Sequence, residues 1–232
     1  MKTLVILHGW KSSKERWQKV KEEIEKSGIR VIIPDIPGFK PETELKEPWD
    51  LGNYLDWLNG FISSENIAEG FFLLGHSFGG ALAAKFSLKY PEKIEGLFLV
   101  ASACIRKKTV KKMFLSRISK VLKVFSFIPF YSTARKAFYR FVVGKSDYLS
   151  VEGVLKETYL KVISEDLSQS LSSIAVPTTI IWGDKDEATP IEDAYLINKK
   201  ISNSKLVIIP GGSHSLEIKM PEVLAQKILD NI

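Results

Sequence analysis

The residues best suited to chemistry in this sequence lie in the segment GHSFGG, where Ser77 stands between Gly75 and Gly79. An apolar run precedes this segment and a pattern typical of a helix follows it. We therefore expect the serine on a sharp turn between a buried strand and a helix. The two glycines remove side chains that would collide in so tight a turn. A hydroxyl presented in this way is suited to be a nucleophile, provided that a base lies beside it.

Three histidines are candidates for that base, and their positions separate them. His76 directly precedes the serine, so on a sharp turn its ring should point elsewhere. His8 ends the first apolar run, where it is expected to brace a loop by hydrogen bonding. His214 follows the last apolar run and should reach the same edge of the sheet as Ser77. We therefore predict His214 as the base.

A histidine base needs a carboxylate that fixes its tautomer and stabilises the imidazolium. Two aspartates, Asp184 and Asp186, directly follow the apolar run TTIIWG. Both are expected at the carboxyl end of a strand, and their spacing alone does not distinguish between them.

Acyl transfer also needs hydrogen-bond donors for the oxyanion of a tetrahedral intermediate. The backbone N–H of Phe78, directly after the serine, is one candidate. The loop HGWKSS after the first apolar run offers Trp10 as the second, and Gly9 keeps this loop open to a substrate.

Short apolar runs that contain β-branched residues alternate with longer amphipathic segments, and this alternation must position the candidate residues. The runs lie at 3–9, 30–37, 70–75, 96–103, 178–183 and 205–212. Near-continuous apolar runs are typical of strands buried on both faces, and repeated strand–helix units give a mostly parallel sheet with helices on both faces. We expect an α/β fold.

The alternation stops between residues 104 and 173, where helical patterns follow one another without a strong strand. We expect an inserted helical segment here, rich in aromatic residues that could line a pocket or pack on one another. Twelve basic residues and no acidic one lie from Arg106 to Lys145. A solvated helix face explains them best, while attraction of an acidic substrate and contact with an anionic membrane remain open. No nucleic-acid-binding motif accompanies the charge.

The composition of the 232 residues, 45% hydrophobic and 26% charged with a net charge of +6, is typical of one globular unit. The first apolar run is too short for a secretory signal, and no segment is long enough to cross a bilayer. The single cysteine, Cys104, cannot form an intramolecular disulfide, so we expect a cytoplasmic protein. Residues at metal-ligand spacing and nucleotide-binding glycine motifs are absent, so no metal and no cofactor are expected.

Taken together, the motifs resemble those of the α/β-hydrolase superfamily. They are HGW at 8–10, PDIPGF at 34–39, GHSFGG at 75–80, WGDKDEATP at 182–190 and GGSHSLEIKMPE at 211–222. The resemblance implies Asp186 as the acid and leaves Asp184 as the fallback. It also implies a core of residues 1–103 and 174–232 under a helical cap of residues 104–173. The chain has no room before the first run for the antiparallel strands that such proteins commonly carry, so we predict a minimal six-stranded, all-parallel sheet. The edge exposed in this way could be bare or could be covered by a partner.

The resemblance implies a serine hydrolase that cleaves carboxylic esters of small to medium size through Ser77, His214 and Asp186. Lactones, thioesters, amides, perhydrolysis and carbon–carbon bond hydrolysis would use the same residues. A protein that keeps the fold only to bind a ligand is the alternative from another class. The expected partner is a small-molecule ester, and the sequence leaves monomer and homodimer open.

Overall fold

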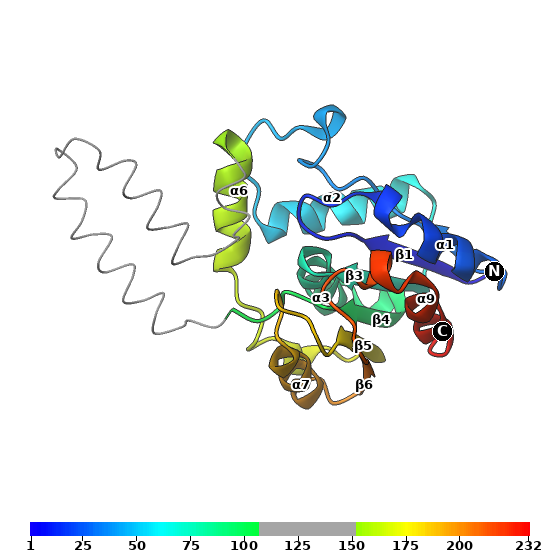
Figure 1. Ribbon diagram of the computed structural model, residues 1–232. Coiled ribbons are helices and arrows are strands. Elements are labelled where there is room, and N and C mark those ends of the chain that lie inside the picture. The colour runs from blue at the N-terminus through cyan, green and yellow to red at the C-terminus, as the bar shows by residue number, and fades with distance from the viewer. Residues whose placement is uncertain (107–151) are drawn as a thin grey trace.

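The computed structural model describes residues 1–106 and 152–232 (Figure 1). Within these residues, one sheet of six strands runs in the order β2-β1-β3-β4-β5-β6, and every neighbouring pair is parallel. The predicted six-stranded, all-parallel sheet of an α/β fold is therefore confirmed. The strands are β1 (Thr3–Leu7), β2 (Arg30–Ile32), β3 (Phe71–His76), β4 (Ile94–Val100), β5 (Thr178–Gly183) and β6 (Ser204–Ile209).

Strand β2 is shorter than the apolar run at 30–37 indicates, because it ends at Ile32. Pro34 and Pro37 follow, and proline has no backbone N–H to donate to a neighbouring strand. The chain leaves the sheet after Ile32, and Ile36 lies against His8, which follows the carboxyl end of β1.

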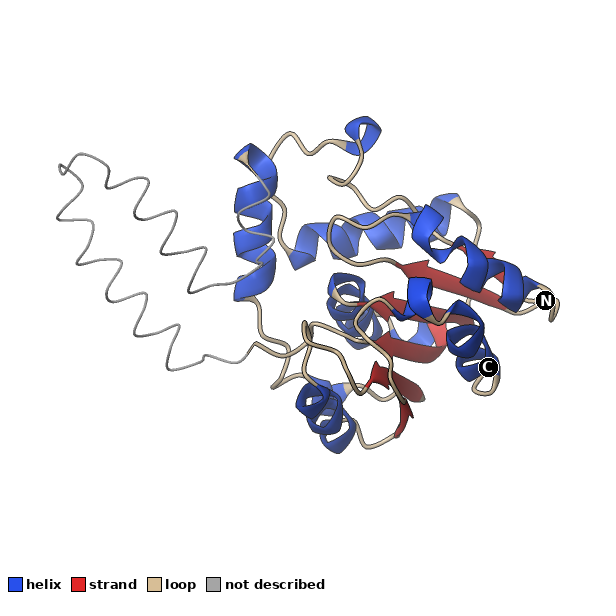
Figure 2. Ribbon diagram, in the orientation of Figure 1, coloured by secondary structure: helices blue, strands red, loops and turns tan. Residues whose placement is uncertain are grey.

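Helices cover both faces of the twisted sheet, as Figure 2 shows. One face packs against α1 (Gln18–Glu25), α8 (Leu216–Lys219) and α9 (Pro221–Leu229), and the other against α2 (Leu51–Ser64), α3 (Phe78–Lys89) and α7 (Ile191–Lys200). Short 3₁₀ helices are η1 (Lys14–Trp17), η2 (Pro41–Thr43), η3 (Pro91–Lys93) and η6 (Leu171–Ser173). Buried apolar side chains on the two faces of the sheet form two clusters that hold the strands in place. The loops at the carboxyl ends of the strands are therefore anchored to a well-packed sheet. None of the helices among the described residues is long and apolar enough to span a membrane.

The part of the expected insertion that the structure describes contains α6 (Gly153–Ser164). This helix stands beside the start of α2 (Figure 1) and is joined to the segment before it. The backbone N–H of Trp49 donates to the Thr158 hydroxyl at 3.1 Å, and Lys161 Nζ donates to the Pro48 carbonyl at 2.9 Å. The cap boundaries at 104 and 173 stay a prediction, and most of the basic and aromatic residues assigned to the cap lie outside the described residues.

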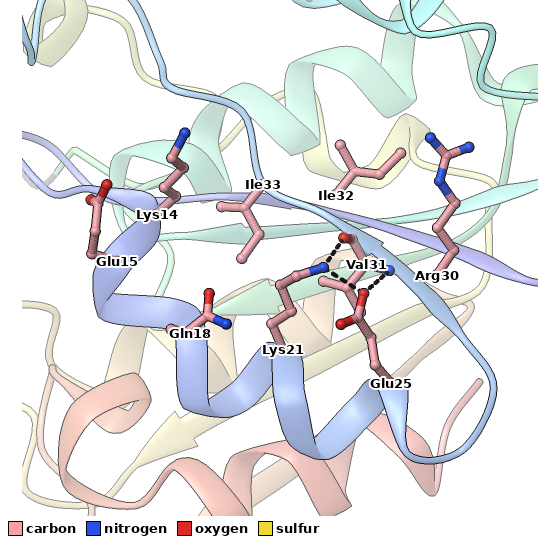
Figure 3. Close-up of a pocket in the computed structure, with 9 residues that line it drawn as sticks. All are labelled: Lys14, Glu15, Gln18, Lys21, Glu25, Arg30, Val31, Ile32 and Ile33. Carbon is pink, nitrogen blue, oxygen red and sulfur yellow. Dashed lines mark hydrogen bonds and ion pairs between the residues drawn. The ribbon is translucent and has the colours of Figure 1, made fainter.

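The edge strands of the sheet are β2 and β6, and β2 lies beside a pocket of about 460 Å³ (Figure 3). Two side chains of α1 bind the outward-facing backbone groups of this strand. Glu25 Oε1 accepts from the Val31 N–H at 3.3 Å, and Lys21 Nζ donates to the Val31 carbonyl at 2.7 Å. Lys21 and Glu25 also form an ion pair with each other. The edge is thus partly covered by the chain's own helix.

Candidate active site

Ser77 is the single residue between β3 and α3, and its backbone has a positive φ of 53° with ψ −115°. Few residues other than glycine adopt such angles, and the strain is held by surrounding structure. A Cβ added at Gly75 would lie 2.2 Å from the Gly79 carbonyl oxygen, and one added at Gly79 would lie 2.2 Å from the Leu7 carbonyl oxygen. The glycines therefore let the turn close directly against β1.

The structure brings His214 to this serine. His214 lies on the loop between β6 and α8, and its Nε2 is 3.1 Å from Ser77 Oγ. This distance is within reach of a hydrogen bond, so Nε2 can accept the serine proton.

The other ring nitrogen of His214 meets Asp186, whose side chain is fully buried. His214 Nδ1 lies 2.8 Å from Asp186 Oδ2, while Oδ1 accepts from the N–H groups of Ala188 and Thr189 at 2.8 Å each. Burial alone would raise the pKa of this carboxyl, but the hydrogen bonds from His214 and Thr189 outweigh it, so the pKa lies below its usual value. Asp186 therefore stays ionised and holds Nδ1–H toward itself.

Asp184, the alternative on position alone, lies elsewhere. Its side chain is exposed, and its Oδ1 accepts from the Gly211 N–H at 2.7 Å. It braces the loop that precedes His214 without contacting the ring.

The two predicted oxyanion donors follow the carboxyl ends of β1 and β3. Among the described residues, no backbone carbonyl accepts a hydrogen bond from the N–H of Trp10 or Phe78. Their rings pack edge to face with centroids 5.5 Å apart. A Cβ added at Gly9 would lie 3.4 Å from Ser77 Cβ, which shows how closely this loop approaches the serine. Neither N–H is taken up by a backbone carbonyl of the described residues, and the role of both as oxyanion donors stays a prediction.

His8 and His76 form no hydrogen bond with the Ser77 hydroxyl among the described residues, where His214 is its partner. His8 Nδ1 donates to the Gly9 carbonyl at 3.0 Å, and its Nε2 accepts from the Ile36 N–H at 3.4 Å. The structure thus places His8 as a link between the first loop and the chain after β2. His76 Nε2 donates to the His214 carbonyl at 2.9 Å.

Residues 1–218 match the family model described as serine aminopeptidase, S33. The chain belongs to this family of serine hydrolases. It is 24% identical over 252 residues to monoacylglycerol lipase ABHD6 of Bos taurus, covering 98% of this chain and 74% of the relative. It is 25% identical over 230 residues to lipase 1 of Psychrobacter immobilis, covering 91% and 70%.

Solved structures show the same fold. A thermophilic esterase from Thermogutta terrifontis superposes with a TM-score of 0.73 at 21% identity, covering 99% of this chain and 90% of the esterase. Together with the family match and the lipase relatives, this likeness confirms the predicted membership of the α/β-hydrolase superfamily.

Three further residues at this site, Thr189, Arg16 and Glu217, were not predicted from the sequence. The Thr189 hydroxyl donates to Asp186 Oδ2 at 2.8 Å and lies 3.2 Å from His214 Nδ1. Its position three residues after an aspartate is a weak signal, since aspartates often accept from the following turn. Arg16 and Glu217 form an ion pair, and nothing in the sequence joins two residues so far apart.

A pocket of about 290 Å³ lies beside Ser77. It is lined by Gly9, Trp10, Lys11, Ser12, Arg16, His76, Ser77, His214, Ser215 and Glu217. No cluster of histidine, cysteine and carboxylate side chains suited to a metal ion occurs in the described parts of the chain.

Proposed function

We propose that this protein is a carboxylester hydrolase that forms an acyl-enzyme on Ser77. One observation carries the proposal: Ser77 Oγ, the His214 ring and Asp186 Oδ2 form a continuous chain with steps of 3.1 and 2.8 Å. This arrangement can move a proton from the hydroxyl to the imidazole while the carboxylate stabilises the resulting positive charge.

The reaction proceeds in two halves. Ser77 Oγ attacks the acyl carbon and gives its proton to His214 Nε2, and the N–H groups of Trp10 and Phe78 bind the oxyanion. The bond to the alcohol oxygen then breaks, and Nε2 protonates the leaving alcohol. Water attacks the acyl-enzyme by the same route and releases the acid. Each donor to the oxyanion contributes about 3 kcal/mol of transition-state stabilisation.

Aromatic rings beside the oxyanion donors support an ester with an apolar acyl group. The Trp10 ring lies 4.9 Å from the Phe39 ring and 5.2 Å from the Tyr159 ring of α6. These faces suit a small to medium acyl chain. The relatives named as lipases support an ester over the amide that the family description suggests. A small-molecule ester is thus the proposed partner, and lactones and thioesters are the nearest alternatives.

The test is a panel of p-nitrophenyl esters of graded acyl length, with lactones, thioesters and anilides, read as kcat/KM. We expect the esters to give the highest values and Ser77→Ala to lose at least about 10³-fold. Incubation with a fluorophosphonate probe should label Ser77 in the parent and not in Ser77→Ala. A folded parent that takes up no probe and turns over no substrate would support a ligand-binding protein instead.

A further inference from the structure

Beside Ser77 lies a buried carboxylate that the proposed reaction does not use. Glu217 belongs to α8, and its side chain is 1% exposed. Its Oε1 accepts from Arg16 Nε at 3.1 Å and Nη2 at 2.8 Å, whereas Oε2 is buried with no hydrogen-bond partner among the described residues. Moving a carboxylate out of water carries a large free-energy penalty, which attraction to one cation often fails to offset. Stability alone is therefore a poor explanation for this pair.

The ion pair joins two segments that are 201 residues apart in the sequence. Arg16 lies in η1, which follows the loop that carries Trp10. Glu217 lies in the short helix that starts directly after the His214 loop, and Arg16 Nη2 is also 3.4 Å from Ser215 Oγ. The pair thus connects the segment that follows Trp10, a candidate oxyanion donor, to the segment that follows His214, the candidate base.

A second connection between the same segments runs through His76. Its Nε2–H donates to the His214 carbonyl, and its ring lies 5.7 Å from the ring of Trp17, the residue after Arg16. Burial lowers the pKa of His76 to about 4, so its ring is neutral at neutral pH. Arg16 therefore connects to the end of the His214 loop through Ser215 and Glu217, and Trp17 connects to it through the ring of His76.

We propose that Arg16 and Glu217 are positioning residues whose ion pair keeps His214 Nε2 within hydrogen-bond reach of Ser77 Oγ. This inference rests on the proposed function, because the geometry it protects is that of the proton transfer. A displacement of about 1 Å between reacting groups can lower a rate about 100-fold. Breaking the pair should therefore lower kcat about 10- to 100-fold and change KM less than about twofold.

Three variants separate positioning from stability. Glu217→Gln removes the charge and leaves the shape. The double variant Arg16→Met with Glu217→Leu replaces the whole pair with apolar groups. The Arg16 side chain is 41% exposed, so the main change is the removal of the buried carboxylate together with its partner, and such a replacement often preserves stability. Glu165→Gln is the control, because Glu165 forms an ion pair of 2.6 Å with Lys85 of α3 and does not line the pocket at Ser77.

We expect the double variant to unfold at a urea concentration equal to or above that of the parent and still to show the lower kcat. Glu165→Gln should keep the kcat of the parent. A double variant with both parental stability and parental kcat would overturn the proposal, even if Glu217→Gln fails to fold.

NMR signals of the histidine rings test the positioning role independently of ester hydrolysis. The sequence has three histidines, so ¹⁵N-histidine labelling gives a small set of ring signals. In the double variant the His214 ring signals should shift or broaden, while those of His8 stay in place. If the parent neither takes up the probe nor hydrolyses esters, the proposed function fails. Unchanged His214 signals in the double variant would instead contradict the positioning role.

Discussion

The pocket at the β2 edge and the pocket at Ser77 differ in how far their polar groups satisfy one another. At the β2 edge, in the larger pocket of about 460 Å³, Lys21 and Glu25 bind each other and both backbone groups of Val31 (Figure 3). At Ser77, in a pocket of about 290 Å³, His76 Nδ1 and Glu217 Oε2 are buried with no hydrogen-bond partner among the described residues.

The pocket at Ser77 also contains a strained backbone, because Ser77 has a φ of 53°. Natural proteins satisfy nearly all buried polar groups, and both exceptions and strained residues gather at functional sites. The pocket at Ser77 is the smaller of the two, yet it combines unsatisfied buried polar groups with a strained residue, which supports the proposal that Ser77 is the reactive residue.

The largest expected effect tests the hydrogen-bonded series of Ser77, His214 and Asp186. Asp186→Asn should lower kcat about 10³- to 10⁴-fold, because an amide can donate toward Nδ1 and so favour the wrong tautomer of His214. Asp184→Asn is the matched control, since the Asn carbonyl can still accept from Gly211 N–H, and it should change kcat less than about fivefold. Equal losses in both variants, measured with one ester, would show that the aspartates share a merely structural role.

The next effect tests the strained turn. Gly79→Ala would place a methyl group 2.2 Å from the Leu7 carbonyl oxygen, so the free energy of unfolding should fall by about 3 kcal/mol or more. Gly60, in α2, has no atom within 4 Å of an added Cβ, and Gly60→Ala should raise the free energy of unfolding by up to about 1 kcal/mol. Urea unfolding of both variants decides the matter. A Gly79→Ala protein as stable as Gly60→Ala would show that the turn is not tightly closed.

The third effect concerns pH and the buried ring of His76. Burial lowers the pKa of this ring from 6.5 to about 4. Between these values the unfolded chain binds more protons than the folded one, so the free energy of unfolding falls as the pH falls from 6.5 to 4. The loss approaches about 3 kcal/mol at pH 4. Its origin in His76 can be tested by substitution.

His76→Gln keeps an N–H donor for the His214 carbonyl and removes the titrating ring. Urea unfolding across this pH range should show a shallower decline for His76→Gln than for the parent. Parallel pH profiles would mean that other groups cause the loss.

The sequence predicts the fold and the principal site residues because each has a local cause. Apolar runs of strand length predict the parallel sheet, and Ser77 is marked by glycines that only a tight turn requires. Asp184 and Asp186 could not be separated by spacing, because the difference depends on which side chain the turn directs toward His214. The motif resemblance favoured Asp186, and the structure brings that residue to the ring.

Contacts between distant segments could not be predicted. The Arg16–Glu217 pair depends on how the loops after β1 and β6 meet, and neither residue carries a local pattern. The short β2 was missed because the apolar run continues through two prolines that cannot complete a ladder.

The smallest expected effect tests the self-satisfied pocket at β2. An edge strand with free backbone groups can pair with another chain, and charged side chains on an edge prevent this. Lys21→Ala with Glu25→Ala frees both backbone groups of Val31, so the free energy of unfolding should fall by about 1 kcal/mol while ester hydrolysis is unchanged. The freed edge should also promote self-association, seen as a concentration-dependent increase in mass by sedimentation or light scattering.

The end of the same helix offers a matched control in the ion pair of Glu23 with Lys26, the residue directly after α1. The pair is 2.7 Å long, and neither residue lines the β2 pocket. Glu23→Ala with Lys26→Ala removes the same charges and should leave the mass unchanged. Association of both variants to the same extent would attribute it to lost surface charge. Association of the Lys21 and Glu25 variant alone would show that two side chains of α1 take the place of a neighbouring strand.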